Sequence, residues 1–265
     1  MIGAIIGDIV GSRFEWNNIK TKEFDFFHEK CEFTDDTILT VAVGKAILES
    51  RRSGSDLSEA AAKAFRKAGD VYPYADYGCG FRSWLLGSPD AGPYNSCGNG
   101  AAMRVSACGY AAKSIAEAVE MSRAVTGVTH NHPEGLKGAE ATAVAVVMAR
   151  NGISMAIIRD YIIKHYYRMD FTLDEIRPSY VYEDTCPCTV PEALEAFFES
   201  TSYEDAIRNA ISIGGDSDTL GAITGGIAGA YWGVPDEIRE KGMSYLDDGL
   251  KGVVEEFESE FPKVK

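Results

Sequence analysis

The chain has 265 residues, 45% hydrophobic and 25% charged, a composition typical of a soluble globular protein with a sizeable core. Its formal net charge of −14 repels nucleic-acid backbones and argues against general DNA or RNA binding. No apolar run reaches the ~18–20 residues that span a bilayer, so we expect no membrane association.

The N-terminal part of the chain predicts two helices around an irregular segment. Met1–Gly11 is small and aliphatic and favours a buried helix, and it lacks the basic start of a signal peptide. Residues 17–33 allow two interpretations, a short strand pair or an irregular loop. The sequence FTDDT at 33–37 then opens a helix whose apolar residues recur at helical spacing.

Capping boxes, in which a short polar residue precedes a Glu by three positions, predict five further helix starts. These are Asp56…Glu59, Ser114…Glu117, Thr172…Glu175, Thr189…Glu192 and Thr201…Glu204. Residues 134–150, 153–165 and 243–257 predict additional helices. Residues 71–100 are dense in Gly, Tyr, Pro and Ser and predict one long non-helical stretch, which is usually functional at that length.

No segment alternates apolar and polar residues over more than a few positions. We therefore predict an all-α fold, a single compact orthogonal helical domain of about ten helices spanning residues 1–265. The six cysteines contain no CxxC pair and are interpreted as reduced thiols of a cytoplasmic protein.

The stretch Ser212–Gly233 is the part around which we expect the chain to be organised. Gly214 and Gly215 end one helix because glycine allows left-handed backbone angles. Each glycine inside the next helix costs about 1 kcal/mol relative to alanine, so another backbone must pack very close to it. These internal glycines are Gly221, Gly225, Gly226 and Gly229. The first turn of this rigid helix presents carboxylates and a hydroxyl.

Two acidic clusters, Thr34-Asp35-Asp36-Thr37 and Asp216-Ser217-Asp218-Thr219, both lie at predicted helix starts. Each alone fits ordinary N-capping, worth about 0.3–1 kcal/mol. If the two starts meet, each pair of carboxylates ~4 Å apart costs about 4 kcal/mol at an effective dielectric near 20. Capping does not offset that cost, whereas one or two divalent cations do. All-oxygen ligands, completed by Thr hydroxyls, favour Mg²⁺, Mn²⁺ or Ca²⁺.

Three further features carry weaker signals. The Gly-rich loop at 96–104 enters a helix, and its unpaired amides suit an anion such as a pyrophosphate, although a plain glycine turn also explains it. His130 and His132 could contact a ligand or a metal, or act only in capping and packing. Glu15 matters only if the turn before it places it over a metal cleft, because an isolated Glu is normally a surface residue.

Five stretches together resemble the ADP-ribosylglycohydrolase family, above all its compact bacterial and phage-type members. They are GDIVGSRFE at 7–15, FTDDT at 33–37, GNGAAMRV at 98–105, VTH at 128–130 and GGDSDTLGAITGGIAGA at 214–230. The acidic pair is the specific part of the match. The resemblance implies an all-helical fold with a cleft that holds a binuclear Mg²⁺ or Mn²⁺ centre.

The resemblance also implies roles for particular residues. Glu15 would be the acid on a mobile loop that gates or assists cleavage, and Asp36 or Asp218 would take a proton from the attacking water. The metal ligands would be Thr34, Asp35, Asp36, Asp216, Asp218 and Thr219. The substrate would contact Ser96, Gly98, Asn99, Gly100, Met103 and His130. Phe81 is added from its chemistry alone, as a surface on which adenine could stack.

The leading hypothesis is hydrolysis of the bond between the anomeric carbon of ADP-ribose and a protein side chain, through a transition state with oxocarbenium character. Two Mg²⁺ or Mn²⁺ ions would bind hydroxyls of the distal ribose and orient a water. An arginine linkage is preferred because a guanidine leaving group suits an acidic cleft, while serine-linked substrates and O-acetyl-ADP-ribose stay open.

Two alternatives accompany this hypothesis. One is a metal-dependent phosphoesterase that cleaves a nucleotide pyrophosphate and releases AMP. The other is a catalytically inactive ADP-ribose-binding or crystallin-like relative, although the retained acidic motifs argue against it. We expect a monomer whose partner is an ADP-ribosylated protein or a small ADP-ribosyl conjugate.

Overall fold

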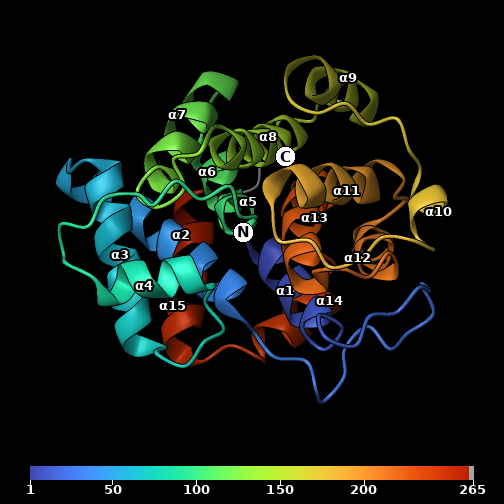
Figure 1. Cartoon of the computed structure of the whole chain (residues 1–265), viewed down its shortest axis with the longest axis horizontal. Coiled ribbons are helices and arrows are strands. Elements are labelled where there is room, and N and C mark those ends of the chain that lie inside the picture. The colour runs from blue at the N-terminus through green and yellow to red at the C-terminus, as the bar shows by residue number, and fades with distance from the viewer. Residues whose placement is uncertain (263–265) are drawn as a thin grey trace.

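The computed structural model describes residues 1–262 and consists of helices joined by irregular segments (Figure 1). Within these residues no strand forms, and one isolated β-bridge pairs Gly98 with Thr185. The predicted all-α fold is confirmed, but the predicted number of helices is too low because several connections contain short helices. The fifteen helices of this part of the chain are α1 (Ile2–Ser12), α2 (Asp35–Ser53), α3 (Leu57–Val71), α4 (Cys79–Leu86), α5 (Gly100–Met103), α6 (Ser106–Ala111), α7 (Ile115–Thr126), α8 (Pro133–Arg150), α9 (Met155–His165), α10 (Leu173–Ile176), α11 (Cys186–Phe198), α12 (Tyr203–Ser212), α13 (Ser217–Tyr231), α14 (Asp236–Met243) and α15 (Asp248–Glu260).

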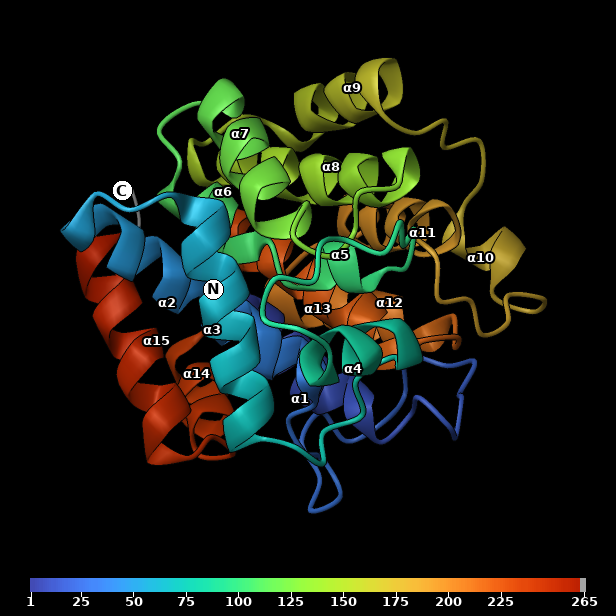
Figure 2. The ribbon, with the colours of Figure 1, turned by 60° about the vertical axis from the view of Figure 1, so that its left-hand side comes forward.

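Helices α1 and α13 lie against each other at the centre of the molecule (Figures 1 and 2). Glycines from both helices form their contact. A Cβ added to Gly7 would lie 1.9 Å from the Gly221 carbonyl oxygen, and one added to Gly225 would lie 2.2 Å from that of Gly3. No side chain fits at such distances, so the expected close approach of a second backbone to the glycine-rich helix is confirmed.

Other helices surround this pair and fix the positions of two helix starts. Helices α8, α11 and α12 contact α13, whereas α3 and α15 contact α2 (Figure 2). Helix α1 contacts both α2 and α13. Because α1 is buried along almost its whole length, it holds the beginnings of α2 and α13 in a fixed relation to each other.

Two predicted segments are wrong in their helix content. The stretch 71–100 is not continuous loop but contains α4, whose Phe81 and Trp84 side chains are buried against the core. The predicted helix over residues 243–257 begins too early. Met243 is the last residue of α14, residues 244–247 are not helical, and α15 begins at Asp248, where the Asp247 carboxylate caps it by accepting a hydrogen bond from the Leu250 amide at 2.9 Å.

Two of the five predicted capping boxes do not begin a helix. Thr189 lies inside α11, which begins three residues earlier, at Cys186. The Thr201 box is displaced by one residue, because Ser202 caps α12 by accepting from the Asp205 amide at 3.1 Å. The other three boxes are confirmed as helix starts. Their N-cap residues are Asp56 in α3, Ser114 in α7 and Thr172 in α10.

Residues 17–33 form the irregular loop that was one of the two interpretations. Asn18 binds the turn before α13 in both directions: its Nδ2 donates to the Gly215 carbonyl at 2.8 Å, and its Oδ1 accepts from the Gly215 amide at 2.7 Å. Arg208 of α12 donates to two carbonyl oxygens of the same loop. The segment that follows Glu15 is therefore bound to the turn that precedes α13. Gly215 has a φ of +76°, which glycine adopts readily.

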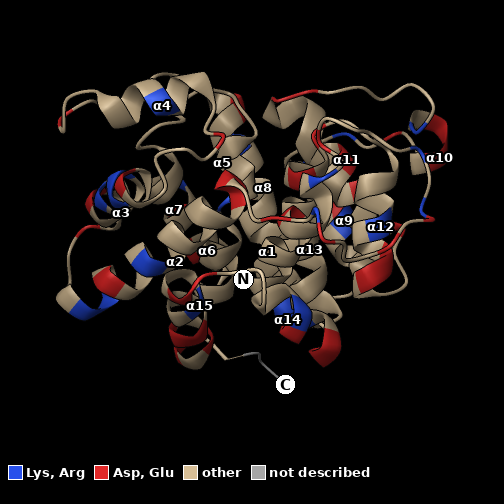
Figure 3. Ribbon diagram, turned by 90° about the horizontal axis from the view of Figure 1, so that it is seen from below, with Lys and Arg blue, Asp and Glu red and all other residues tan. Residues whose placement is uncertain are grey.

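The surface is acidic, with 40 Asp and Glu against 26 Lys and Arg, spread over many of the helices and loops (Figure 3). Among residues 1–262, no helix combines the length and the apolar character needed to cross a membrane. All six cysteines are free thiols.

Candidate active site

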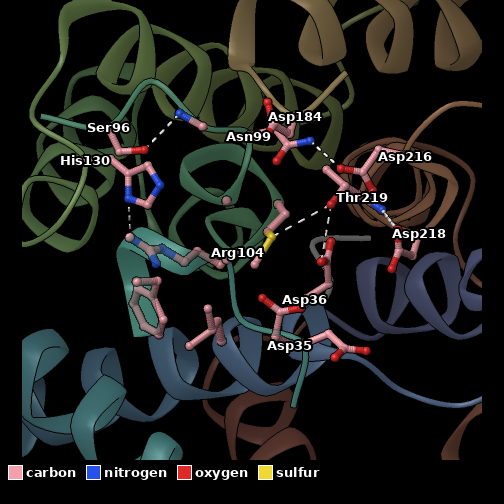
Figure 4. A pocket seen from close by; sticks show the side chains of 18 of the residues that line it. Asp35, Asp36, Ser96, Asn99, Arg104, His130, Asp184, Asp216, Asp218 and Thr219 are labelled. Carbon is pink, nitrogen blue, oxygen red and sulfur yellow. Dashed lines mark hydrogen bonds between the residues drawn. The ribbon is translucent and has the colours of Figure 1, made fainter. Parts of the chain in front are cut away.

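A cavity of about 380 Å³ opens where the first turns of α2 and α13 meet the loop before α5 (Figure 4). All but one of the residues predicted to form the site line it; the exception is Thr34. The predicted residues that line the cavity are Glu15, Asp35, Asp36, Phe81, Ser96, Gly98, Asn99, Gly100, Met103, His130, Asp216, Asp218 and Thr219. The structure therefore brings together segments that are far apart in the sequence.

The two acidic helix starts meet on one side of the cavity. Thr219 Oγ1, in the first turn of α13, lies 3.3 Å from Asp36 Oδ2 in the first turn of α2. Carboxylate oxygens of Glu15, Asp216 and Asp218 all lie within 4.8 Å of one another. Figure 4 shows Asp36, Asp216, Asp218 and Thr219 of this group close together. We call this group, with Asp35, the acidic side of the cavity.

No Lys or Arg of residues 1–262 forms an ion pair with the acidic side. Burial, followed by repulsion from neighbouring carboxylates, raises the pKa of Asp35, Asp36 and Asp218 well above the ordinary value. The pKa of Glu15 rises to about 7, through its partial burial and then the charges of Asp216 and Asp76. Protons or cations are therefore needed to stabilise this arrangement.

The donor set fits a hard divalent cation. Every available ligand atom on the acidic side is an oxygen, which is the ligand type that Mg²⁺, Mn²⁺ and Ca²⁺ prefer. In the part of the chain that the structure describes, Asp36 Oδ1 is buried without a hydrogen-bond partner, although buried carboxylate oxygens are normally satisfied. A cation between the two helix starts would satisfy this atom and neutralise the clustered charge.

Thr34 is placed differently from the other predicted ligands. Its hydroxyl donates to Asp8 Oδ1 at 2.7 Å and accepts from the Asp36 amide at 3.2 Å, as the N-cap of α2. Asp8 is fully buried in α1 and also accepts from the amides of Thr34 and Thr37, at 3.0 and 3.1 Å. Asp8 therefore fixes the start of α2 against α1. The hydroxyl of Thr34 is used in this contact, and its role as a metal ligand stays a prediction.

The loop before α5 forms the opposite side of the cavity. The expected run of unpaired amides is only partly present, because the Gly98 amide donates to Ser96 Oγ at 3.1 Å and the Asn99 amide to the Asp184 carbonyl at 2.8 Å. Asn99 also reaches across the cavity, where its Nδ2 donates to Asp216 Oδ2 at 2.7 Å. An anion on this side therefore needs donors besides those two amides.

His130 and Arg104 lie next to this loop and also line the cavity (Figure 4). Arg104 has no exposed surface, and its Nη2 lies 3.4 Å from His130 Nδ1. Burial, and then the charge of Arg104, lower the pKa of His130 well below the ordinary value. The ring of Tyr94 lies 5.6 Å from that of His130 and also lines the cavity. We call Arg104, His130 and the loop 96–100 the basic side of the cavity.

Phe81 lies in the cavity wall with little of its surface exposed. Its ring is stacked on Trp84, with centroids 5.7 Å apart, and packs edge-on against Phe65 at 5.9 Å. Only 5% of the residue is exposed. Stacking of adenine on Phe81 stays a prediction, and the structure shows that neighbouring aromatic rings cover most of this side chain.

Several residues of the site were not predicted from the sequence. Asp76 and Asp184 add carboxylates at the cavity, but each is a single acid in a loop without a recognisable motif. Trp16 stacks on Tyr182 with centroids 5.3 Å apart, which joins the loop of Glu15 to the loop before α11. Arg104 carried a usable signal, since it is a lone cation in an otherwise apolar segment.

The protein therefore belongs to the class of all-helical proteins in which two helix N-termini form an acidic cavity that could hold a cation. Within that class, the chain belongs to the ADP-ribosylglycohydrolase family, whose family model matches residues 1–263.

Relatives of known name support this assignment. ADP-ribosylhydrolase ARH3 of Xenopus tropicalis is 25% identical over 301 residues, which cover 88% of this chain and 86% of the relative. ADP-ribosyl-[dinitrogen reductase] glycohydrolase of Rhodospirillum rubrum is 27% identical over 225 residues, which cover 82% of this chain and 74% of the relative. A solved structure described as an ADP-ribosylglycohydrolase-related protein complex has a TM-score of 0.70 at 22% identity, covers 97% of this chain and 95% of its own, and shares the fold.

Proposed function

We propose that this protein hydrolyses the glycosidic bond that joins ADP-ribose to a protein side chain, with arginine as the preferred linkage. Membership of the ADP-ribosylglycohydrolase family and the names of the relatives support the reaction class. The observation that carries the proposal is the pairing of an acidic side with a basic side in one cavity. A substrate with a ribose next to a diphosphate offers complementary groups to both.

The acidic side would hold one or two divalent cations through Asp35, Asp36, Asp216, Asp218 and Thr219. A bound cation supplies Lewis acidity and lowers the pKa of a coordinated water. The chain's own residues supply the rest. The carboxylate of Asp36 or of Asp218, through an oxygen that does not bind the cation, would accept the proton of an attacking water.

On the basic side, the Ser96 hydroxyl, the loop 98–100 and His130 would bind the diphosphate and fix the ribose relative to the carboxylates. The hydrogen bond from Asn99 to Asp216 joins the loop to the acidic side. A group bound by the loop would therefore be held in a fixed position relative to the carboxylates. Glu15, half-buried at the cavity, would close over the bound substrate or assist the departure of the leaving group.

The groups beside Glu15 support the arginine preference. Glu15, Asp76 and Asp184 place carboxylates at the cavity, and Trp16 is 74% exposed next to them. A guanidinium is recognised by carboxylates in its plane and by aromatic rings on its face. The guanidine leaving group becomes cationic when it is protonated, and the carboxylates around it would stabilise that charge.

The test is incubation of the protein with Mg²⁺ or Mn²⁺ and with peptides carrying ADP-ribose on arginine, serine or aspartate, followed by mass spectrometry. We expect the arginine peptide to be restored and intact ADP-ribose to be released. Samples treated with EDTA should show no release. Faster release from the serine peptide would contradict the arginine preference while supporting the reaction class.

Two other outcomes would favour the alternative functions. Release of AMP, with a ribose-phosphate left on the peptide, would identify a phosphoesterase. Binding of ADP-ribose without release from any of the peptides, in the presence of either cation, would identify a binding protein.

A further inference from the structure

Arg104 is a buried cation that has no carboxylate partner among residues 1–262. Its guanidinium lies over the ring of Phe65, 4.4 Å from the centroid, and 5.6 Å from the centroid of Phe81. In residues 1–262, its Nε and Nη1 atoms have no hydrogen-bond partner. Burying an unpaired charge is costly, and burial accordingly lowers the pKa of Arg104 to about 10. A cation retained under these conditions needs an explanation beyond packing.

The remaining nitrogen of Arg104 is directed at Thr129 and at His130, and Figure 4 shows the contact with His130. Nη2 donates to Thr129 Oγ1 at 2.6 Å and lies 3.4 Å from His130 Nδ1. Because a guanidinium has donors only, Thr129 Oγ1 must act as the acceptor in this bond. The hydroxyl proton of Thr129 is then free to point at His130 Nδ1, which lies 2.7 Å away. Its other acceptor, the Thr126 carbonyl, is 3.5 Å away.

We propose that Arg104 is a positioning residue which, together with Thr129, holds His130 as the uncharged tautomer that carries its proton on Nε2. Two donors converge on an unprotonated Nδ1. A proton on that atom would instead face the Arg104 Nη2–H group at 3.4 Å, and it would leave the Thr129 hydroxyl proton only the Thr126 carbonyl at 3.5 Å as its acceptor. Arg104 thereby determines which ring nitrogen of His130 can donate to a ligand, without contacting the ligand itself.

The Nε2 atom faces the loop of the basic side. It lies 3.6 Å from the positions that a Cβ on Gly98 or on Gly100 would occupy. The amides of Gly98 and Asn99 are already used inside the protein, so an Nε2–H group supplies a donor that the loop lacks. The ligand class is a nucleoside diphosphate, and this part of the inference rests on the proposed function. The tautomer itself does not.

The test is ¹⁵N NMR of protein labelled in its four histidines, with the His130→Asn variant to assign the signals. At neutral pH we expect His130 to show an unprotonated Nδ1 and a protonated Nε2. Arg104→Met removes the N–H group that faces Nδ1, so the tautomer with its proton on Nδ1 should become populated. Arg104→Lys keeps a donor-only cation and should retain the original tautomer.

Affinity for ADP-ribose provides the second readout. Loss of a charge-assisted positioning bond should weaken binding on the order of 10- to 100-fold in Arg104→Met. In a His130→Ala background the same substitution should change the dissociation constant by less than about 2-fold, because the partner is already absent. Arg66→Met is the matched control, since Arg66 also covers an aromatic ring, Trp84 at 4.1 Å, and should alter neither readout.

A wild-type His130 with its proton on Nδ1 would overturn the proposal, and this result needs no variant to fold. An unchanged tautomer in folded Arg104→Met, or additive effects of Arg104→Met and His130→Ala on affinity, would overturn it as well. If wild-type protein does not bind ADP-ribose, the proposed function fails, while the NMR measurement still decides the role of Arg104.

Discussion

The two sides of the cavity contrast in how their charges are arranged. On the acidic side, carboxylates from α2 and α13 crowd together without an ion-pair partner in residues 1–262, and Asp36 Oδ1 has no hydrogen bond. On the basic side, Arg104 is equally buried, and its Nε and Nη1 atoms have no hydrogen-bond partner among residues 1–262. No ion pair in this part of the chain joins the two sides. A cation would balance the charge of the acidic side, and an anion would balance that of the basic side.

Neither side is arranged for maximal stability of the fold. Opposite charges in one cavity would stabilise the fold most if they were paired, yet the bond between Asn99 and Asp216 is what joins the two sides. An amide connects the sides without cancelling either charge. Substitutions that change one side and leave the other intact should therefore have separable effects on catalysis and on ligand binding.

The largest expected effect is that of Asp218→Asn on catalysis. We expect kcat/KM for the preferred substrate to fall roughly 10²- to 10⁴-fold, because a group that acts on the water or its cation is lost. The basic side stays intact, so the dissociation constant of ADP-ribose should change far less. Steady-state kinetics and calorimetry measure the two quantities.

The same variant should be more stable than wild type when no divalent cation is present, because burial and neighbouring carboxylates destabilise the charged form of Asp218. Asp160→Asn, on the exposed surface of α9, is the control and should leave activity and stability unchanged. A parallel loss of activity and ADP-ribose binding in Asp218→Asn would contradict the separation of the two sides.

A carboxyl group outside the cavity allows the effect of burial to be measured alone. Glu192 of α11 has a buried oxygen without a partner in the described residues, and burial raises its pKa to about 7 from 4.5. A raised pKa in the folded state stabilises the fold below pH 4.5, and this contribution is lost as the pH rises through 7. From pH 4.5 to 8, wild type should lose about 3 kcal/mol of unfolding free energy relative to Glu192→Gln.

Urea denaturation of both proteins across this pH range measures the difference. Addition of Mg²⁺ should not change it, since Glu192 lies outside the cation-binding cluster. A difference between the two proteins that disappears in Mg²⁺ would show that Glu192 is linked to the acidic side after all.

The contact between α1 and α13 determines where the acidic side stands. Gly221→Ala places a Cβ 2.4 Å from the Gly7 carbonyl oxygen, so the two helices must separate. We expect a loss of about 1–3 kcal/mol in unfolding free energy, measured by urea denaturation, together with weaker cation binding. In Gly252→Ala the added Cβ of α15 meets open space, and stability should be unchanged or higher by up to about 1 kcal/mol. Equal effects of the two substitutions would contradict this account of the contact.

The smallest predicted effect concerns the exposed aromatic pair beside Glu15. Trp16→Ala should raise KM for an arginine-linked peptide roughly 2- to 5-fold, the size expected of an exposed cation–π contact. The dissociation constant of free ADP-ribose should not change, because that ligand lacks the acceptor side chain. Trp232→Ala, at the far end of α13, is the control. An equal rise in KM for serine-linked peptides would contradict a role in guanidinium recognition.

The acidic side could be predicted from the sequence because its signals are local. The two short acidic clusters, each at a helix start, can be recognised in the sequence. The glycines of α13 indicate that a second backbone packs against this helix. That this backbone is α1, and that Asp8 fixes the start of α2, depends on contacts between distant segments.

The basic side was predicted less completely because its properties depend on contacts between distant segments. The loop 96–104 was recognised, but whether its amides are free depends on the bridge to Thr185 and on the Asp184 carbonyl, which no local pattern reveals. The role of Arg104 depends on its complete burial, which results from tertiary packing. Likewise α4 was missed because its burial of Phe81 and Trp84 is a tertiary effect that outweighs the surrounding Gly and Pro residues.

The central claim is that the two acidic helix starts together hold hard divalent cations. The most direct measurement is a titration with Mn²⁺ in the absence of substrate, for wild type and for Asp218→Asn. Binding is detected by electron paramagnetic resonance as a loss of the free Mn²⁺ signal. The account predicts that wild type binds two Mn²⁺ ions, that Mg²⁺ displaces them, and that the variant binds fewer or binds them much more weakly. Wild-type protein that leaves the free Mn²⁺ signal unchanged, or a variant that binds Mn²⁺ as wild type does, would contradict it.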